Sequence, residues 1–248
     1  MILFKPGARR YPAGVDLVTE QKLERRARIL AAVRELVAER GWRDVTVRDL
    51  ARRCRVSVPT LYNQFGGKDE LLAAAALAHF AELLERTVRE AGPGGFERLL
   101  ALVARCAENM TGQSAYHRSL LEAFAVARET GLVQDAFVDD LTRALAAELA
   151  EMRGQGQLED WVDAGLLAGQ ITASCVSASV RWARGGLGDA GLRAAMLHAA
   201  SLLLLGAARG EARRGLERAA RAAQAELSAD GFARSGPRRR RAAQRRAR

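Results

Sequence analysis

The sequence predicts an all-α protein, and three observations support this prediction. Apolar residues recur at helical spacing over long stretches of the chain. No stretch alternates strictly between apolar and polar residues, and only five prolines interrupt the 248 residues. A chain of this length can bury one large hydrophobic core or two modest ones.

The first expected element is a helix over about residues 19–40. Gly41 stands where helices commonly end, because glycine adopts left-handed backbone angles with little strain. The apolar stripe of this helix consists of Leu23, Ile29, Leu30, Val33, Leu36 and Val37. Residues 1–18 lack periodicity, and we expect them to form a flexible basic arm.

Two short helices are expected next, over about residues 47–54 and 58–65. Thr46 is a good N-cap for the first, and Asp49 three residues later approximates a capping box. Ser57 is the N-cap of the second, and Pro59 falls in its first turn, where a missing N–H does no harm. Such short helices are unstable alone, so the longer helices on either side must brace them.

The remaining chain is predicted to form a helical body. Its expected helices span about residues 68–91, 96–110, 114–128, 132–152, 158–183 and 190–209, with a helical extension over 209–229. The clearest breaks are "AGPGG", "RGQGQ" and "RGGLG". Residues 230–248 are expected to be a disordered arginine-rich tail.

The net charge of +10 is unevenly distributed. Residues 1–70 carry 15 basic and 9 acidic side chains, which gives +6, whereas residues 71–232 carry 16 and 20, which gives −4. Residues 233–248 add 8 arginines and no acid. A basic front on a slightly acidic middle indicates a head that binds a polyanion.

Several other classes of protein are disfavoured. Cys54, Cys106 and Cys175 stand far apart, so we expect buried thiols in a reducing compartment rather than disulfides or metal ligands. Two apolar stretches, 164–180 and 194–208, are shorter than the roughly 20 residues that cross a bilayer. With no apolar run of signal-peptide length either, we expect a cytoplasmic protein.

No pattern of catalytic residues stands out. The sequence has no Glu-x-x-His pair, no recognisable Ser/His/Asp arrangement and no phosphate-binding glycine loop. We therefore predict no enzymatic activity, no metal site and no cofactor.

The two short helices fit a helix-turn-helix, in which the second helix enters the major groove of DNA. The residues expected to face the interior are Val47, Leu50, Ala51, Val56, Leu61 and Phe65. Those left to project from the second helix are Val58, Pro59, Thr60, Tyr62, Asn63 and Gln64. On a basic scaffold, this polar face is typical of a DNA-reading surface.

The segment "ILAAVRELVAERGWRDVTVRDLARRCRVSVPTLYNQFGGKDELL" resembles the DNA-binding domain of the tetracycline-repressor (TetR) family of bacterial regulators. The matching features are the "ERGW" helix end, "TVRDLA", the recognition helix "VSVPTLYNQF" and the opening "KDELL". The resemblance covers roughly residues 20–72. It implies an N-terminal three-helix helix-turn-helix domain (19–67) followed by a helical ligand-binding and dimerisation domain (68–229).

The resemblance also implies roles for individual residues. Thr60, Tyr62 and Lys68 match the family's phosphate contacts, which set register without reading sequence, and Thr46 is a similar candidate. Candidates for base-edge contacts are Val58, Pro59 and Asn63, while Arg48 can reach either phosphate or base. Simpler alternatives remain: Tyr62 packs beside Phe65, Thr60 is only an early helix residue, and Asn63, Arg48 and Arg55 face solvent.

Arg55 is the one departure from the family pattern. The family usually has glycine in this turn. If the position is left-handed, arginine is strained there by about 1 kcal/mol, although its cation can lie near a phosphate.

The last two long helices are too apolar for the surface of a monomer. A four-helix interface between two copies would bury small and apolar residues that permit close approach. The candidates are Gly165, Gly169, Ala173, Leu192, Met196, Ala199, Leu203 and Gly206. The alternative is core packing within one subunit.

A family resemblance also implies a cavity for a small-molecule effector, enclosed by residues 68–183. The candidate lining residues are Phe80, Leu84, Phe96, Leu100, Val103, Met110, Tyr116, Leu120, Phe124, Trp161 and Gln170. The polar groups expected to orient a ligand are Asn109, Gln113, Tyr116 and His117. Because this set is largely apolar, we expect a neutral or hydrophobic effector.

Three functions remain in competition. The first is a ligand-responsive repressor that binds palindromic operator DNA as a homodimer. The second is an architectural or constitutive DNA-binding protein of the same fold, which a body without an enclosed cavity would favour. The third, an enzyme on a helical scaffold, leaves the segment 46–68 unexplained. In the first two, the arginine-rich tail either adds sequence-blind DNA affinity or is an unselected end.

Overall fold

The computed structural model describes residues 17–90, 92, 94–124 and 131–229, and within these ranges the secondary structure is helical apart from one isolated bridge. The helices are α1 (Leu17–Arg40), α2 (Val47–Cys54), α3 (Val58–Phe65), α4 (Lys68–Glu90), α5 (Phe96–Gly112), α6 (Ser114–Phe124), α7 (Gly131–Gly154), α8 (Ala164–Ala183), α9 (Asp189–Leu205) and α10 (Gly210–Ala229). The all-α prediction is confirmed. The predicted arm and the arginine-rich tail lie outside the described residues, apart from the first turn of α1.

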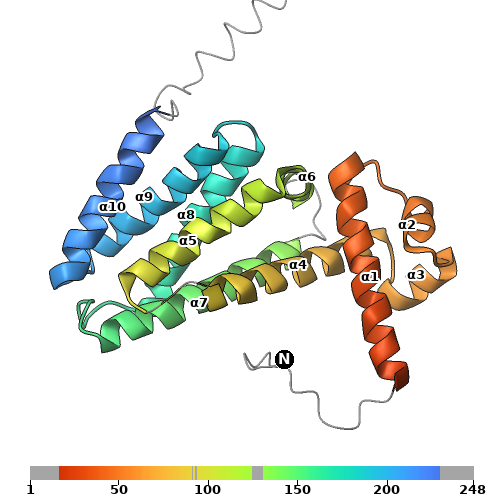
Figure 1. Cartoon of the computed structure of the whole chain (residues 1–248), viewed down its shortest axis with the longest axis horizontal. Coiled ribbons are helices and arrows are strands. Elements are labelled where there is room, and N and C mark those ends of the chain that lie inside the picture. The colour runs from red at the N-terminus through yellow and green to blue at the C-terminus, as the bar shows by residue number, and fades with distance from the viewer. Residues whose placement is uncertain (1–16, 91, 93, 125–130, 230–248) are drawn as a thin grey trace, which may run out of the picture.

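The first three helices form a compact unit at one end of the molecule, here called the head, and α4 runs from it along the body (Figure 1). The head has its own core, built from one face of each helix. It includes Leu50 and Leu61, which are 0% and 2% exposed. Val47, Val56 and Phe65 pack against this core as partly buried residues, as the sequence predicted.

The head core does not stop at the end of α3. The first turns of α4 supply Leu71, Leu72 and other buried residues, and α6 supplies Tyr116 and Leu120. Because α6 belongs to the body in sequence, the head and the body share this layer. A movement of α4 or α6 would therefore displace side chains in the head core.

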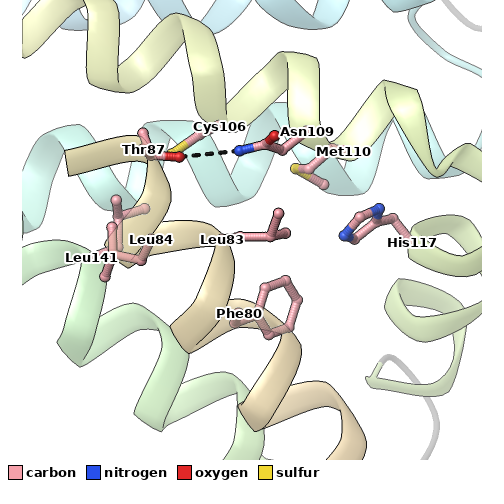
Figure 2. A pocket seen from close by; sticks show the side chains of 9 residues that line it. All are labelled: Phe80, Leu83, Leu84, Thr87, Cys106, Asn109, Met110, His117 and Leu141. Carbon is pink, nitrogen blue, oxygen red and sulfur yellow. Dashed lines mark hydrogen bonds between the residues drawn. The ribbon is translucent and has the colours of Figure 1, made fainter. Parts of the chain in front are cut away.

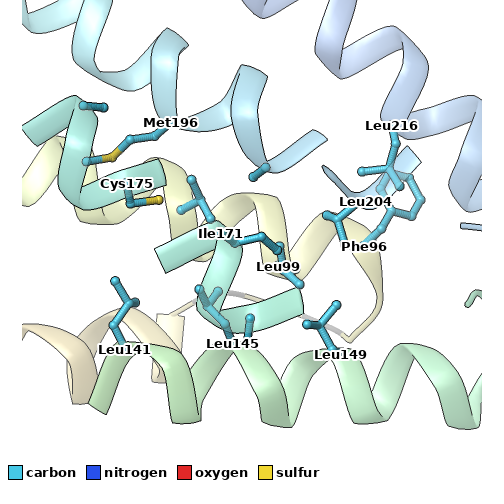
Figure 3. Packing of buried hydrophobic residues seen from close by; sticks show 14 of the residues in the cluster. Phe96, Leu99, Leu141, Leu145, Leu149, Ile171, Cys175, Met196, Leu204 and Leu216 are labelled. Atoms are coloured by element: carbon cyan, nitrogen blue, oxygen red, sulfur yellow. The ribbon is translucent and has the colours of Figure 1, made fainter. Parts of the chain in front are cut away.

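The body is a bundle in which α8 and α9 pack against each other and against α7 and α5 (Figure 1). Its core consists of leucines and other apolar side chains from five helices, as Figure 3 shows for Leu99, Leu145 and Ile171. The last helix, α10, packs closely along α9. In its first two turns Gly215 lies so near Phe96 that a Cβ there would stand 2.2 Å from the ring, so a larger residue would have to displace the Phe96 side chain.

Two predicted helix boundaries were wrong. The segment 158–163 was expected to be helical, but Leu158 forms an antiparallel bridge with Ala208, and α8 begins after Asp163, whose carboxylate accepts from the Leu166 N–H. The segment 206–209 is likewise not helical, because Arg209 N–H donates to the Gln157 carbonyl at 2.8 Å. At both places two loops that are distant in sequence pair with each other instead of forming helix. Local periodicity cannot reveal such pairing.

Candidate nucleic-acid interface and apolar pocket

The two short helices are held by local contacts that the sequence predicted. Thr46 and Asp49 form a reciprocal capping box at the start of α2. The Ser57 hydroxyl accepts from the Thr60 N–H at 3.2 Å at the start of α3, where Pro59 occupies the first turn. Burial of Leu61 fixes one face of α3 against the head core, so its other face must point to solvent.

The predicted DNA-contacting residues lie at the surface of the head to different degrees. Those that are exposed are Thr46, Arg48, Arg55, Pro59, Tyr62 and Asn63. Val58, Thr60 and Lys68 are half-buried, and Val58 also packs against the head core. Tyr62 is 51% exposed, and the Arg26 guanidinium lies over the Phe65 ring.

Several candidate phosphate contacts already make hydrogen bonds within the head. The Thr46 hydroxyl donates to the Asp49 carboxylate at 2.6 Å, and the Lys68 ammonium donates to the Arg43 carbonyl at 3.3 Å. An ammonium carries three donors, so Lys68 retains others for a phosphate. These bonds hold the side chains in place before any partner arrives.

Arg55 occupies a left-handed turn with φ 54°, and is the non-glycine residue with positive φ in the described chain. Its backbone N–H caps the end of α2 by donating to the carbonyls of Ala51 and Arg52. The left-handed geometry on which the expected strain depends is therefore present. The resemblance predicted a turn at this position, and only the arginine departs from the family's usual glycine.

A shallow basic hollow lies beside this turn and was not predicted. It is lined by Leu36, Arg40, Asp49, Arg52, Arg53 and Arg55. Asp49 remains an anion there, since the hydrogen bond from Thr46 and the nearby guanidinium groups lower its pKa. Arg53 pairs with Glu39 and Glu35 of α1, which leaves this surface basic but partly neutralised.

A second, apolar pocket lies in the body between α4, α5, α6 and α7 (Figure 2). It is lined by Phe80, Leu83, Leu84, Thr87, Cys106, Asn109, Met110, His117 and Leu141. Its cavity volume is about 30 Å³, room for about one water molecule. Burial raises the pKa of Cys106 to about 12, so its thiol is not a nucleophile at neutral pH.

Some of the side chains predicted to line an effector cavity border this pocket, and others do not. Phe80, Leu84 and Met110 line it, and so do two of the expected polar groups, Asn109 and His117. Leu83, Thr87, Cys106 and Leu141 were missed. Spacing on a helix shows which face is inward, but it cannot distinguish a residue that borders a cavity from one that fills the core.

The other predicted lining residues lie elsewhere. Core positions are taken by Phe96, Leu100 and Val103 in the body and by Tyr116 and Leu120 in the head. Trp161 and Gln170 are on the surface, and Trp161 is 77% exposed, because the segment before α8 turns outward instead of continuing the helix. The Phe124 side chain lies outside the described residues.

Three aromatic polar side chains meet where the pocket adjoins the head. His79 of α4 lies 5.3 Å from Tyr116 and 5.2 Å from His117, measured between ring centroids. All three are nearly buried, and His79 Nε2, Tyr116 Oη and His117 Nε2 have no hydrogen-bond partner within the described protein. Burial lowers the pKa of His79 to about 3 and that of His117 to about 4, so both rings are neutral at pH 7.

Helix α6 joins the head, the pocket and the C-terminal helices within four consecutive residues. Tyr116 lies in the head core and His117 lines the pocket. Arg118 stacks on Trp182, 4.1 Å from the ring centroid, and donates to the Trp182 carbonyl at the end of α8. Ser119 accepts a 2.6 Å hydrogen bond from the Trp42 N–H, between α1 and α2.

The predicted dimer face needs correction. Leu192 and Met196 are 0% and 1% exposed and belong to the core of a single subunit, because α9 turns this face toward α5 and α8. Gly165, Ala173 and Gly206 are exposed, while Gly169, Ala199 and Leu203 are half-buried. Two large apolar side chains that were not predicted stand out on these helices: Leu166 is 74% exposed and Leu202 is 50% exposed.

Residues 29–75, which span the head and the start of α4, match the sequence model of bacterial regulatory proteins of the tetR family. Over these residues the chain is similar to the TetR family. Within the described residues, its outward α3 face and capped helix-turn-helix are the features that this match covers.

Characterised relatives show the same similarity. The chain is similar to the HTH-type transcriptional repressor KstR of Mycolicibacterium smegmatis, with 32% identity over 114 residues, 45% of this chain and 56% of the relative. KstR of Mycobacterium tuberculosis is 28% identical over 144 residues, 57% of this chain and 64% of the relative. The match thus spans between about half and two thirds of these relatives.

Solved structures share the fold. The TetR-family repressor FadR of Thermus thermophilus, in complex with lauroyl-CoA, has a TM-score of 0.60 and 24% identity, covering 73% of this chain and 94% of its own. SmeT, the repressor of a multidrug efflux pump of Stenotrophomonas maltophilia, has a TM-score of 0.58 and 21% identity, covering 75% and 92%. At this identity the likeness concerns the arrangement of helices. No helix among the described residues is long and apolar enough to span a bilayer.

Proposed function

We propose that this chain is a cytoplasmic TetR-family transcriptional repressor that binds a palindromic operator as a homodimer and leaves it when a small, mainly apolar molecule enters the body pocket. One observation carries the DNA-binding part. The α3 helix is fixed from behind by Leu61 and presents Pro59, Tyr62 and Asn63 outward. A braced short helix with a polar outer face suits the major groove.

The contacts around α3 support a division of roles. Tyr62 and Lys68 offer a hydroxyl and an ammonium, which suit phosphate oxygens. Asn63 can form a bidentate pair with adenine, and Pro59 can touch a thymine methyl. In this proposal the partly buried Val58 contributes mainly to packing, which narrows the base-reading set.

The homodimer part rests on α8 and α9. These two helices pack together, and both carry exposed apolar side chains, Leu166 and Leu202. Exposed glycine and alanine on α8 would allow the helices of a second copy to approach closely. A two-fold dimer would place two α3 helices roughly 34–36 Å apart, or one DNA turn, if its operator has adjacent half-sites.

The regulatory part rests on the shared layer between head and body. The pocket is bounded by α4 and α6, and both helices also supply residues to the head core. A molecule larger than the 30 Å³ cavity must move these helices or their side chains. It releases DNA only to the extent that it binds the moved form more tightly than the DNA-bound form.

The small volume of the pocket also favours a second candidate, an effector-independent DNA-binding protein of the same fold. Pockets for drug-sized ligands commonly measure about 300–1,000 Å³. The two candidates differ in whether any small molecule lowers DNA affinity. The bundle around the pocket, with polar atoms left unpaired inside it, supports the ligand-responsive form.

The test begins with DNA. Genomic fragments retained by the purified full chain are sequenced, and we expect an enriched palindrome bound far more tightly than unrelated duplex. The double variant Tyr62→Ala/Lys68→Ala should lose this binding, whereas Arg218→Ala, which removes one exposed positive charge from α10, should not. Equal retention of all fragments, or full binding by the double variant, would overturn the proposal.

The ligand part is tested separately on the same operator. Small molecules are screened for release of the protein from the DNA, and those that act should compete with one another for one site. If none of a broad apolar library causes release while operator binding is intact, the effector-independent form is correct.

A further inference from the structure

Three polar side chains line the body pocket among the described residues, and two of them are paired with each other. Asn109 donates to the Thr87 hydroxyl at 3.0 Å and accepts from Arg86 at 3.0 Å, as the dashed line in Figure 2 shows for the first bond. The third is His117, which is 1% exposed and faces the pocket with Nε2 lacking any partner. A bound molecule thus meets one unpaired polar atom in an otherwise apolar wall.

The chemical role of that atom follows from the other side of the ring. His117 Nδ1 lies 3.1 Å from the Gln113 carbonyl oxygen. Since a carbonyl can only accept, Nδ1 must carry the proton. In a neutral imidazole the second nitrogen then holds a lone pair, so Nε2 is an acceptor that needs a donor. Burial keeps the ring neutral by lowering its pKa to about 4.

The nearby positive charges disfavour a cation, and the acceptor character of Nε2 disfavours a carboxylate as its partner. Arg34 and Arg86 lie close enough to His79, which adjoins His117, to lower its pKa further. Their positive charge opposes a metal ion or an ammonium group in this place. A carboxylate would bring only acceptors to Nε2, and no cationic side chain lines the pocket. Leaving either group buried without a partner costs stability.

Building on the proposed function, we infer that the effector is an uncharged, mainly apolar molecule carrying a hydroxyl or amide N–H that donates to His117 Nε2. Phe80, Leu83, Leu84, Met110 and Leu141 surround the apolar part. The donor group lies at the junction with Tyr116, whose ring is 5.4 Å from that of His117 and belongs to the head core. The residue that recognises the donor group therefore lies next to a residue of the head core, so that binding the donor and moving the head involve the same part of α6.

The test uses three probes of similar shape: 4-ethylphenol, 4-ethylanisole and the anion of 4-ethylbenzoic acid. Each must displace pocket side chains, because the cavity is about 30 Å³, and this common cost cancels in the comparison. Binding to the full chain without DNA is measured by calorimetry at pH 7. We expect the phenol to bind at least about tenfold more tightly than the anisole, the effect of one satisfied buried acceptor, and the anion to bind weakest.

Matched variants assign the difference to His117. His117→Phe keeps a ring but removes the acceptor, so the phenol should lose its advantage over the anisole while the anisole binds as before. His117→Gln, whose amide oxygen accepts, should restore part of the advantage and remains informative if the Phe variant does not fold. Equal binding of phenol and anisole to the unchanged protein, tighter binding of the anion, or an advantage that survives in His117→Phe would overturn the inference.

These outcomes are independent of the proposed regulation. Donor selectivity is measured without DNA, so it stands or falls regardless of operator release. A protein that binds the phenol selectively yet holds its operator unchanged would contradict the proposed ligand response and leave the pocket chemistry in place.

Discussion

The two short helices of the head and the layer where the head meets the pocket differ in how completely their polar groups are hydrogen-bonded. In the head, both short helices are capped, and the central leucines are almost fully buried. Where the head meets the pocket, His79, Tyr116 and His117 are nearly buried and keep unpaired polar atoms, and His117 also lines the small cavity. A short helix whose polar groups are hydrogen-bonded and whose outer face is polar is suited to bind at its surface. A buried layer with unpaired polar atoms is suited to admit a ligand that supplies their hydrogen bonds, and to change conformation when the ligand binds.

The two regions meet at α6. Tyr116 and His117 are neighbours in sequence, yet one belongs to the head core and the other to the pocket wall. In the proposed function, this contact couples a ligand in the pocket to the position of the head.

The largest expected effect is a pH dependence that originates in the pocket region. His79 and His117 have folded-state pKa values of about 3 and about 4, below their ordinary value of 6.5. The unfolded chain therefore takes up protons first as the pH falls below 6.5, and stability present at pH 7 is lost. Between pH 7 and pH 5 we expect a loss of about 2 kcal/mol for each histidine.

Urea unfolding of the full chain at the two pH values measures this loss. In His117→Gln the loss should shrink by about half, because one of the two histidines is gone. Carboxylates with lowered pKa values, such as Asp49, contribute mainly below this window, since their ordinary values lie near 4. Equal stability at pH 7 and pH 5 would show that the buried rings are not held neutral.

Packing gives the next largest effect and separates the two regions directly. Leu50→Ala in the head opens a cavity at a site with 0% exposure, and we expect it to lower the free energy of unfolding by about 3 kcal/mol. Leu83→Ala removes the same atoms beside an existing pocket and should cost about 1 kcal/mol. Comparable losses from the two variants in urea titrations would mean that the pocket wall is packed as tightly as the head core.

The joint between the regions provides a smaller effect. Ser119→Ala leaves the Trp42 N–H without its 2.6 Å partner, at an expected cost of about 1–2 kcal/mol. Because this bond fixes α6 to the turn before α2, the variant should also weaken the effect of a bound ligand on DNA affinity. Ser114→Ala, at the start of the same helix, is the matched control. An unchanged ratio of DNA affinities with and without ligand would exclude the bond from the coupling.

The smallest expected effect concerns the turn between α2 and α3. Arg55→Gly relieves a left-handed arginine, which is worth about 1 kcal/mol, but it also raises the entropy of the unfolded chain by a comparable amount. We expect stability to rise by less than about 1 kcal/mol in thermal unfolding, with no change in the helix content. A clear loss of stability would show that the arginine side chain itself holds the turn.

The sequence allowed the head to be predicted more completely than the body. Its signals are local: Thr46 and Asp49 lie three residues apart and form the capping box, and the periodic placement of Leu50 and Leu61 gives the buried face. In the body, Leu158 pairs with Ala208, fifty residues away, and no local pattern marks such a pair. Trp161 was therefore placed in a helix facing a cavity, although it lies on the surface.

The residues of the dimer interface and of the ligand pocket were also hard to predict from local sequence patterns. Leu192 and Met196 are apolar residues of a type common at interfaces. Whether they face a second copy or the core of their own subunit depends on how α9 is rotated against α5 and α8. Similarly, Leu83 and Leu99 are both apolar helical residues, and only the assembled bundle places one beside a pocket and the other in the core. Tertiary packing decides these roles.

The most direct test of the account is the DNA selectivity of Asn63→Ala, a residue on the exposed face of α3. Affinity for the enriched fragment and for an unrelated duplex is measured at one fixed salt concentration. The account predicts that the variant loses about tenfold or more of its affinity for the enriched fragment while binding the unrelated duplex as before. If Asn63→Ala, Pro59→Ala and Tyr62→Ala all bind the enriched fragment like the unchanged chain, the outward face of α3 does not read DNA.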